Sequence, residues 1–269
     1  MSTVNYFAYG YEKDIPGDPN RESTYIFMFN PTKHDAEVTA TIYYEDPELE
    51  PGEFTCQVPS EGRTLVLGWS KIGWDVVVKN VRFGVKLLST EPIVAEMGIG
   101  SYWPEDDHKT RDMNSMVGAP ALSKVWYHAY GYSSYPKTKN ALKETFYAYI
   151  LNPGKKDAEI DINLFYTPFV WGPNPEDRDV SKPRKSKHKV TVPGEHMKAI
   201  LIDEMVNFHL KPGVPSWNDK SRDWSAIFVS SEPVCIEYEC AAWRVGNPLM
   251  MGRTITMCQP SPLKLYQTL

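Results

Sequence analysis

Apolar and polar residues alternate along two segments of the chain. In segment 37–44 the even-numbered residues, from Val38 to Tyr44, are apolar or aromatic, and the odd-numbered ones start with Glu37. Segment 159–166 repeats this pattern from Ile160 onward. A period of two predicts a half-buried β-strand. We therefore expect the even-numbered residues to face a core and the odd-numbered ones, Tyr43 included, to face outward.

Four further strands are predicted around these two. The residues that follow each Glu-Pro pair, 93–99 and 234–240, also alternate, which places Glu96 and Glu237 on outward faces. The runs 25–29 and 147–151 are almost wholly apolar. Such a run is predicted to be buried on both faces or to pack against a partner subunit.

Turns are predicted where the apolar runs end. Asn30-Pro31 and Asn152-Pro153 are each followed by short polar residues and a new alternating segment, so each is predicted to form a hairpin turn. Helical periodicity is scarce, and segment 203–209 is the one candidate for a short helix.

The chain repeats itself. Residues 22–44 align with residues 144–166 without a gap, and 9 of these 23 pairs are identical. Three shorter matches keep the same order: 6–11 with 127–132, 58–59 with 192–193, and 91–96 with 232–237. Four matches in one order indicate a tandem duplication.

The second copy is longer than the first. The offset between the copies grows from 121 to 141, which leaves about 12 extra residues between Tyr166 and Pro193 and about 7 more before Glu232. Proline, asparagine and charged residues in both insertions, including the basic run 184–189, indicate surface loops.

The strand pattern predicts the fold class. Short strands with Pro and Gly between them and no long helix predict an all-β protein of two tandem β-sandwich or small-barrel domains of the same fold. We expect residues 1–122 to form the first domain and residues 123–269 the second, which carries the loop insertions.

Composition excludes some classes of function. A net charge of −5 disfavours a nucleic-acid-binding surface, because phosphate contacts need clustered Lys and Arg. No apolar run approaches the roughly 20 residues that span a bilayer, and segment 1–5 lacks the pattern of a signal peptide. The four cysteines form no CxxC pair, which fits reduced, buried thiols. We expect a cytoplasmic protein with no nucleic-acid partner and no membrane insertion.

Several motifs resemble the sensory rhodopsin transducer family. They are the aromatic opening that ends in Gly-Tyr before a proline (Gly10-Tyr11 to Pro16, Gly131-Tyr132 to Pro136), the Asn-Pro turn that leads into Asp-Ala-Glu, the Val-Pro step and the strand after Glu-Pro. The resemblance covers nearly the whole chain, twice. It implies one β-sandwich per copy, domains that assemble around a symmetry axis, and binding of small molecules, with sugars among the suspected ligands.

The opening departs from the family pattern. An acidic residue usually precedes the glycine in the family, whereas Tyr9 and Tyr130 stand there in this chain. An aromatic side chain thus stands where the family has a polar contact to the ligand. The duplication and the insertions also differ from the single-domain transducers, so the resemblance implies ligand binding in general rather than a rhodopsin partner.

Aromatic residues in the opening segment of each copy are the first candidates for a ligand site. Tyr9, Tyr11, Tyr130 and Tyr132 stand at matching positions of the two copies, and Trp126 and His128 join them in the second copy. An aromatic face can stack on the C–H face of a sugar ring while phenol hydroxyls fix the orientation of the sugar. Alternatively, these rings close the end of each sandwich core.

Two glutamates on matching strands are the second set of candidates. Glu96 is followed by Trp103, and Glu237 by Trp243 and Arg244. Such a set could form a polar clamp with a stacking wall, or it could lie on a solvated sheet face or in a packing contact between the copies. A glycosidase would need the two carboxylates within roughly 5 to 9.5 Å, and nothing in the sequence brings them together.

The sequence supports neither a metal site nor a catalytic nucleophile. His34 and the segment 106–108 lack a second spaced His or Cys for zinc, and no cysteine has a nearby His or helix start to activate it. We therefore predict no catalytic residue, no metal ion and no cofactor.

The leading hypothesis is a small-molecule-binding protein, with sugars among the ligands. Two domains in one chain imitate a dimer of the single-domain family, so a homodimer of this chain is expected to form a pseudo-fourfold assembly. The alternatives are a carbohydrate-acting enzyme with its site in the second copy, and a structural scaffold whose aromatic faces are interfaces.

Overall fold

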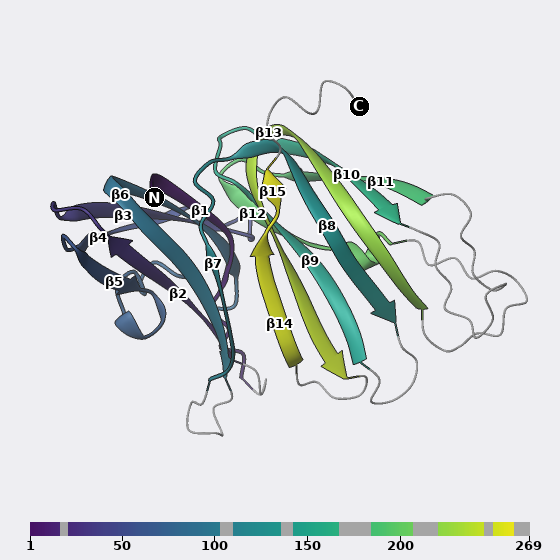
Figure 1. The fold of residues 1–269 in the computed structure, drawn as a ribbon, viewed down its shortest axis with the longest axis horizontal. Helices are drawn as coiled ribbons and strands as arrows, with labels where there is room; N and C mark the ends of the chain where they lie inside the picture. The colour runs from purple at the N-terminus through teal and green to yellow at the C-terminus, as the bar shows by residue number, and fades with distance from the viewer. Residues whose placement is uncertain are drawn as a thin grey trace, which may run out of the picture.

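The fold is that of an all-β protein, as predicted. A computed structural model describes residues 1–16, 21–102, 110–135, 142–166, 184–206, 220–244 and 250–260 (Figure 1). Apart from strands, these residues contain the short 3-10 helices η1 (Gly68–Ser70) and η4 (Ile202–Glu204). The helix predicted over 203–209 is therefore reduced to η4, and residues 207–209 lie outside the described part. No helix in the described ranges has the length and apolar character needed to cross a bilayer.

The first seven strands, which we call the first module, form two layers that share one long strand. They are β1 (Ser2–Tyr11), β2 (Arg21–Asn30), β3 (Ala36–Tyr44), β4 (Gly52–Val58), β5 (Gly62–Val66), β6 (Arg82–Tyr102) and β7 (Thr110–Val117). The first half of β6 pairs with β1 and β3, and the second half pairs with β2 and β7. Residues 90–92, between the two halves of β6, have no partner in these ladders, and Pro92 among them lacks an N–H to donate.

The remaining strands, the second module, repeat this arrangement. They are β8 (Ser123–Tyr135), β9 (Leu142–Asn152), β10 (Ala158–Tyr166), β11 (Arg184–Val192), β12 (His196–Leu201), β13 (Lys220–Arg244), β14 (Met250–Met257) and β15 (Gln259–Pro260). The long strand β13 takes the place of β6, pairing first with β8 and β10 and then with β9 and β14. The strands that pair with β13 thus correspond to the strands that pair with β6, which fits a duplication.

The alternation along the sequence determines which side chains form the core. Val38 and Ile160 are both fully buried, and the odd-numbered neighbours Glu37 and Glu159 are exposed. Tyr43 is an exception, because it was expected to face outward but is only 5% exposed. It lies close enough to Glu195 of the second module to interact electrostatically with it.

Some side chains expected in the core are less buried than predicted. Tyr238 and Cys240 are only partly buried, although Val234 and Ile236 on the same strand are fully buried. All four cysteines are free thiols, but Cys56 and Cys240 are partly exposed rather than buried.

The predicted hairpins at Asn30-Pro31 and Asn152-Pro153 are wrong. β2 and β3 belong to different layers and do not pair, and the same holds for β9 and β10. Each segment therefore carries the chain from one layer to the other. The fully buried Asn30 amide donates to the carbonyl groups of His34 (2.7 Å) and Val58 (3.1 Å). Asn152 makes the corresponding bonds, so the recurring asparagine satisfies the backbone of each crossover.

The two modules pack against each other asymmetrically. Strand β1 of the first module lies against β9 and β13 of the second, β12 contacts β3 and β6, and β7 runs beside β14 (Figure 1). The first module thus covers the outer face of the β12-β9-β13-β14 layer. This packing decides which candidate residues remain accessible.

Candidate functional site

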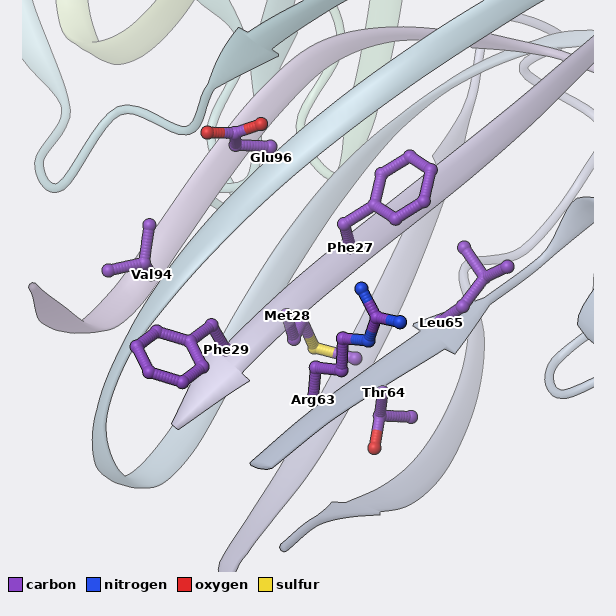
Figure 2. A pocket seen from close by; sticks show the side chains of 8 residues that line it. All are labelled: Phe27, Met28, Phe29, Arg63, Thr64, Leu65, Val94 and Glu96. Carbon is purple, nitrogen blue, oxygen red and sulfur yellow. The ribbon is translucent and has the colours of Figure 1, made fainter. Parts of the chain in front are cut away.

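A hollow of about 670 Å³ lies over the β5-β2-β6 layer of the first module (Figure 2). Its lining residues are Phe27, Met28, Phe29, Arg63, Thr64, Leu65, Val94 and Glu96. Alternate residues of a strand point to the same side, so the rings of Phe27 and Phe29 share the outer face of β2. Arg63 and Glu96 add one positive and one negative group to this apolar surface (Figure 2).

Large apolar side chains on this outer face are exposed. Phe27 is 39% exposed, Phe29 47%, and Val117 on the neighbouring strand β7 58%. Exposed apolar side chains on neighbouring strands make this face a candidate interaction surface. We call this surface the open face; it comprises Phe27, Phe29, Arg63, Leu65, Val94, Glu96 and Val117.

The second module has the same face in the same register. A row across the open face reads Leu65, Phe27, Glu96 and Val117 from β5 to β7. The corresponding row across β12, β9, β13 and β14 reads Ala199, Tyr149, Glu237 and Met257. Tyr149 is only 1% exposed and Glu237 is inaccessible, because the first module covers them.

Tyr9 is the residue that occupies this second face. Its ring stacks on that of Tyr149, with centroids 3.8 Å apart and planes inclined by 9°. Its backbone N–H donates to a carboxyl oxygen of Glu237 at 2.9 Å. The second face therefore binds a flat ring and a hydrogen-bond donor that lie next to each other.

A β-bulge directs the backbone of Tyr9 toward Glu237. Phe7 pairs with Val85 and Gly10 with Phe83, so Ala8 and Tyr9 together lie opposite Gly84. A bulge frees backbone groups from the ladder and re-aims them. We call this element, Ala8 and Tyr9 with Gly84 opposite, the Tyr9 bulge.

Burial changes the acidity of Glu237. Loss of solvent raises the pKa of its carboxyl to about 8, and the N–H groups of Ala8 and Tyr9 partly oppose this rise. The second carboxyl oxygen, Oε1, is buried without a hydrogen-bond partner among the described residues. The group therefore carries a proton at neutral pH.

Polar contacts flank the Tyr9 bulge. Arg82 pairs with Glu45 at 3.1 Å, and its guanidinium lies 5.9 Å from the ring centroid of Tyr147. Glu45 in turn accepts a hydrogen bond from the N–H of Ala199 at 2.9 Å. These groups connect the first module to strands β9 and β12.

The predicted site residues fall into different environments. Tyr9 and Glu237 meet at the contact between the modules, and Glu96 lines the hollow. Tyr130 is 62% exposed, and its hydroxyl donates to Asp223 at 3.0 Å. Tyr11 and Tyr132 are partly buried and pack against the core.

Trp126 and His128 lie inside the second module. Trp126 is fully buried, and its indole N–H is shared between the carbonyl groups of Ser123 and Val234 at 3.0 Å each. His128 is 4% exposed among the rings of Tyr238, Trp224 and Phe146, with centroids at 4.0, 4.9 and 6.4 Å. Burial lowers the pKa of His128 to about 4, so its imidazole is neutral.

The predicted glutamate clamps are described only in part. Trp103 and the side chains of Trp243 and Arg244 lie outside the described part of the chain. Glu96 and Glu237 belong to different modules, and an inaccessible carboxyl such as that of Glu237 cannot reach a sugar. The described residues also contain no group of three His, Cys, Asp or Glu side chains that could hold a metal ion.

Sequence reasoning missed the aromatic and charged residues of the hollow. Phe27, Phe29 and Arg63 were not candidates, although the apolar run 25–29 was noted as a strand that needs a partner on its second face. The sequence did not show that β5 pairs with β2. This pairing places Arg63 and Leu65 next to the two rings.

Comparisons with known proteins return solved structures of partial similarity. No protein-family profile and no curated protein sequence matches the chain. Among solved structures, the Anabaena sensory rhodopsin transducer is 26% identical over 36% of this chain and 86% of its own, with a TM-score of 0.30. Thermotoga maritima 1070 is 21% identical over 52% of this chain and 96% of its own, with a TM-score of 0.34. Neither match assigns the chain to a family.

Proposed function

We propose that this chain is a ligand-binding protein and that the open face of the first module is its binding surface. The ligand presents a flat ring to Phe27 and a hydrogen-bond donor to Glu96. One observation carries the proposal: the corresponding pair in the second module, Tyr149 and Glu237, holds the ring and the N–H of Tyr9 in this way. In the first module the same pair is accessible.

The size and chemistry of the hollow suit a small molecule. Its volume of about 670 Å³ falls within the range of ligand pockets. Phe27 and Phe29 supply apolar surface, and Arg63 supplies a positive charge for an acidic group of the ligand. A sugar meets the same requirements, because its C–H face can stack on a ring while a hydroxyl donates to Glu96.

The proposal is tested with small probes. N-acetyl-tyrosinamide and methyl glucosides, added in a thermal-shift assay, are expected to raise the Tm, because a ligand that binds only the folded state stabilises it. Phe27→Ala and Glu96→Gln should each weaken binding about tenfold or more by titration calorimetry. The folded state should survive both changes, since neither side chain is buried.

Leu88 offers a matched control. It is 49% exposed on the first half of β6, outside the open face, so Leu88→Ala should leave binding of the probes unchanged. The proposal is wrong if no ring-bearing probe shifts the Tm, or if Phe27→Ala binds the probes as tightly as the original chain.

A further inference from the structure

The basic run 184–189 is a strand rather than the surface loop that its composition predicted. It forms most of β11, which pairs with β10 from Arg184 to Val192 without a bulge. β11 stands at the end of its layer, and no strand in the described part of the chain pairs with its other side (Figure 1). A regular edge of this kind presents backbone groups with which a further strand can pair.

The backbone groups that face this free edge can be identified from two hydrogen bonds. The carbonyl group of Thr191 accepts a bond from the ammonium group of Lys198 at 3.1 Å. Glu159, which lies opposite Thr191 on β10, donates its N–H to the hydroxyl of Ser231 and not to β11. The backbone of Thr191 therefore points away from β10. Because successive residues of a strand point to opposite sides, the other odd-numbered residues of β11 do the same.

Three of these odd-numbered residues are lysines. Lys185, Lys187 and Lys189 are exposed, and their side chains share one face of the sheet because they are two positions apart. Each of them combines a positive side chain with an N–H and a C=O that face the free edge. We call these three residues the lysine edge.

The neighbouring strand β10 neutralises little of this charge. Lys189 lies 3.8 Å from a carboxylate oxygen of Asp161. Asn163 stands opposite Lys187, and an aromatic ring, with its centroid 5.0 Å from the ammonium group, stands opposite Lys185. Two of the three ammonium groups thus face no carboxylate across the ladder.

The first module does not share this charge. Its edge strand β4 pairs with β3 as β11 pairs with β10, and Glu53 and Thr55 stand where β11 has Lys187 and Lys189. The chain as a whole carries a net charge of −5. The lysine edge is therefore a local property of the second module.

Like charges disfavour a second copy of this chain as the partner of the lysine edge. If β11 strands of two copies paired, the lysines of one would share a face with those of the other, and like charges directly opposite each other destabilise a strand pair. A strand with acidic side chains meets the opposite situation, because complementary charges favour its approach and its register.

We infer that the lysine edge binds an extended acidic segment of a partner protein, which pairs with β11 as a further antiparallel strand. Acidic side chains at every second position of the segment lie beside the three ammonium groups, at the roughly 5 Å that separates opposite side chains. The side chains between them lie on the other face, beside His188 and Val190, which are half-buried. The segment is thus one in which Asp or Glu alternates with residues such as Val or Thr.

A synthetic peptide tests the inference on the full chain. The peptide acetyl-Thr-Glu-Val-Glu-Val-Glu-Thr-amide should bind with one molecule per chain in titration calorimetry at low salt. Raising the salt to about 0.5 M should weaken binding severalfold, because salt screens exposed charges. The rearranged peptide acetyl-Glu-Glu-Val-Val-Thr-Thr-Glu-amide should bind about tenfold or more weakly, because it cannot place its three carboxylates on one face of a strand.

Charge reversal of the lysine edge has a matched control. Changing all three of its lysines to Glu should raise the Kd of the alternating peptide about thirtyfold or more. The same change at three exposed lysines of the crossover segments alters the net charge equally and should leave the Kd within about twofold at physiological salt. These control positions are Lys33, Lys155 and Lys156.

Methylation of the peptide backbone distinguishes strand pairing from charge attraction and leaves the protein unchanged. In an antiparallel pair the N–H groups of the Glu residues point at β11, and those of the Val residues point away. N-methylation of the central Glu should therefore raise the Kd about tenfold or more, whereas N-methylation of one Val should have a much smaller effect.

Three results would overturn the inference. The first is a chain that does not bind the alternating peptide, which would leave the lysines with a purely protective role at the edge. The second is equal binding of the alternating and rearranged peptides, and the third is equal binding of the two methylated peptides. None of these results bears on the proposed function, because the open face lies on the other module.

Discussion

The ring of Tyr9 lies flat on the ring of Tyr149, at 3.8 Å, although the two residues belong to different halves of a duplicated chain. The same position in the second half, Tyr130, is largely exposed. Two equivalent tyrosines thus have different environments, because one copy of the module is covered by the other and the arrangement is not reciprocal. Several expected outcomes follow from this asymmetry.

Tyr9→Ala should destabilise the protein far more than Tyr130→Ala does. Truncation of Tyr9 removes a buried ring, a stacked partner and packing between the modules, for a loss of roughly 3 kcal/mol or more in the free energy of unfolding. Tyr130→Ala at low protein concentration should change it by less than about 1 kcal/mol. Urea denaturation measures both, and equal losses would contradict the asymmetric packing.

Glu237→Gln should flatten the dependence of stability on pH. The carboxyl of Glu237 has a pKa of about 8 when folded and 4.5 as its ordinary value. Between these values the folded chain holds one more proton than the unfolded chain. This contribution to stability is therefore fully present below pH 4.5, falls by about 1.4 kcal/mol per pH unit above it, and is lost once the pH exceeds 8.

Urea denaturation of the original chain and of Glu237→Gln at pH 5.5 and pH 8 checks this expectation. The glutamine keeps an acceptor for the N–H of Tyr9 but does not ionise, so the variant should gain relative stability at the higher pH. Burial also raises the pKa values of Glu12 and Asp203, to about 7 and about 6. Both groups are present in both proteins, so their contributions cancel when the two free energies of unfolding are subtracted. If the free energies of unfolding of the two proteins change in parallel with pH, Glu237 is not the source of the pH dependence.

Asn30→Ala and Asn152→Ala should each destabilise the protein by about 1–3 kcal/mol. Each substitution leaves buried carbonyl groups of a crossover without a donor. Asn→Asp at either position should cost more, because a carboxylate would face those carbonyl oxygens. Thermal unfolding measures the losses, and a mild effect of the aspartate variants would show that the amide donors are unimportant.

Gly84→Ser should loosen the contact between the modules. A Cβ atom at Gly84 would lie 2.9 Å from a methyl carbon of Leu151 and 3.1 Å from the carbonyl oxygen of Phe7, so the neighbours must shift. We expect a loss of about 1–3 kcal/mol. The reciprocal change Ser225→Gly, at the uncovered equivalent position, should cost about 1 kcal/mol or less. Similar losses at both positions would argue against tight packing at Gly84.

Local patterns predicted much of this molecule. The alternation around Val38 and Ile160 identified two strands and their buried faces, because the side chains of a strand have a period of two whatever the surrounding structure. Glu96 and Glu237 were placed on outward faces for the same reason. The hairpins at Asn30 and Asn152 were predicted wrongly, since a turn motif does not tell whether the next strand pairs with the last or crosses to the other layer.

The sequence by itself determined the strands, their inward faces and the repeat, because these depend on side chains that are neighbours along the chain. Only the tertiary structure decided that Glu237 is buried while Glu96 lines a hollow, and that Tyr9 is covered while Tyr130 is exposed. These differences arise from how one module docks on the other, a contact between residues more than a hundred positions apart. The alternation that both copies share does not tell which copy covers which.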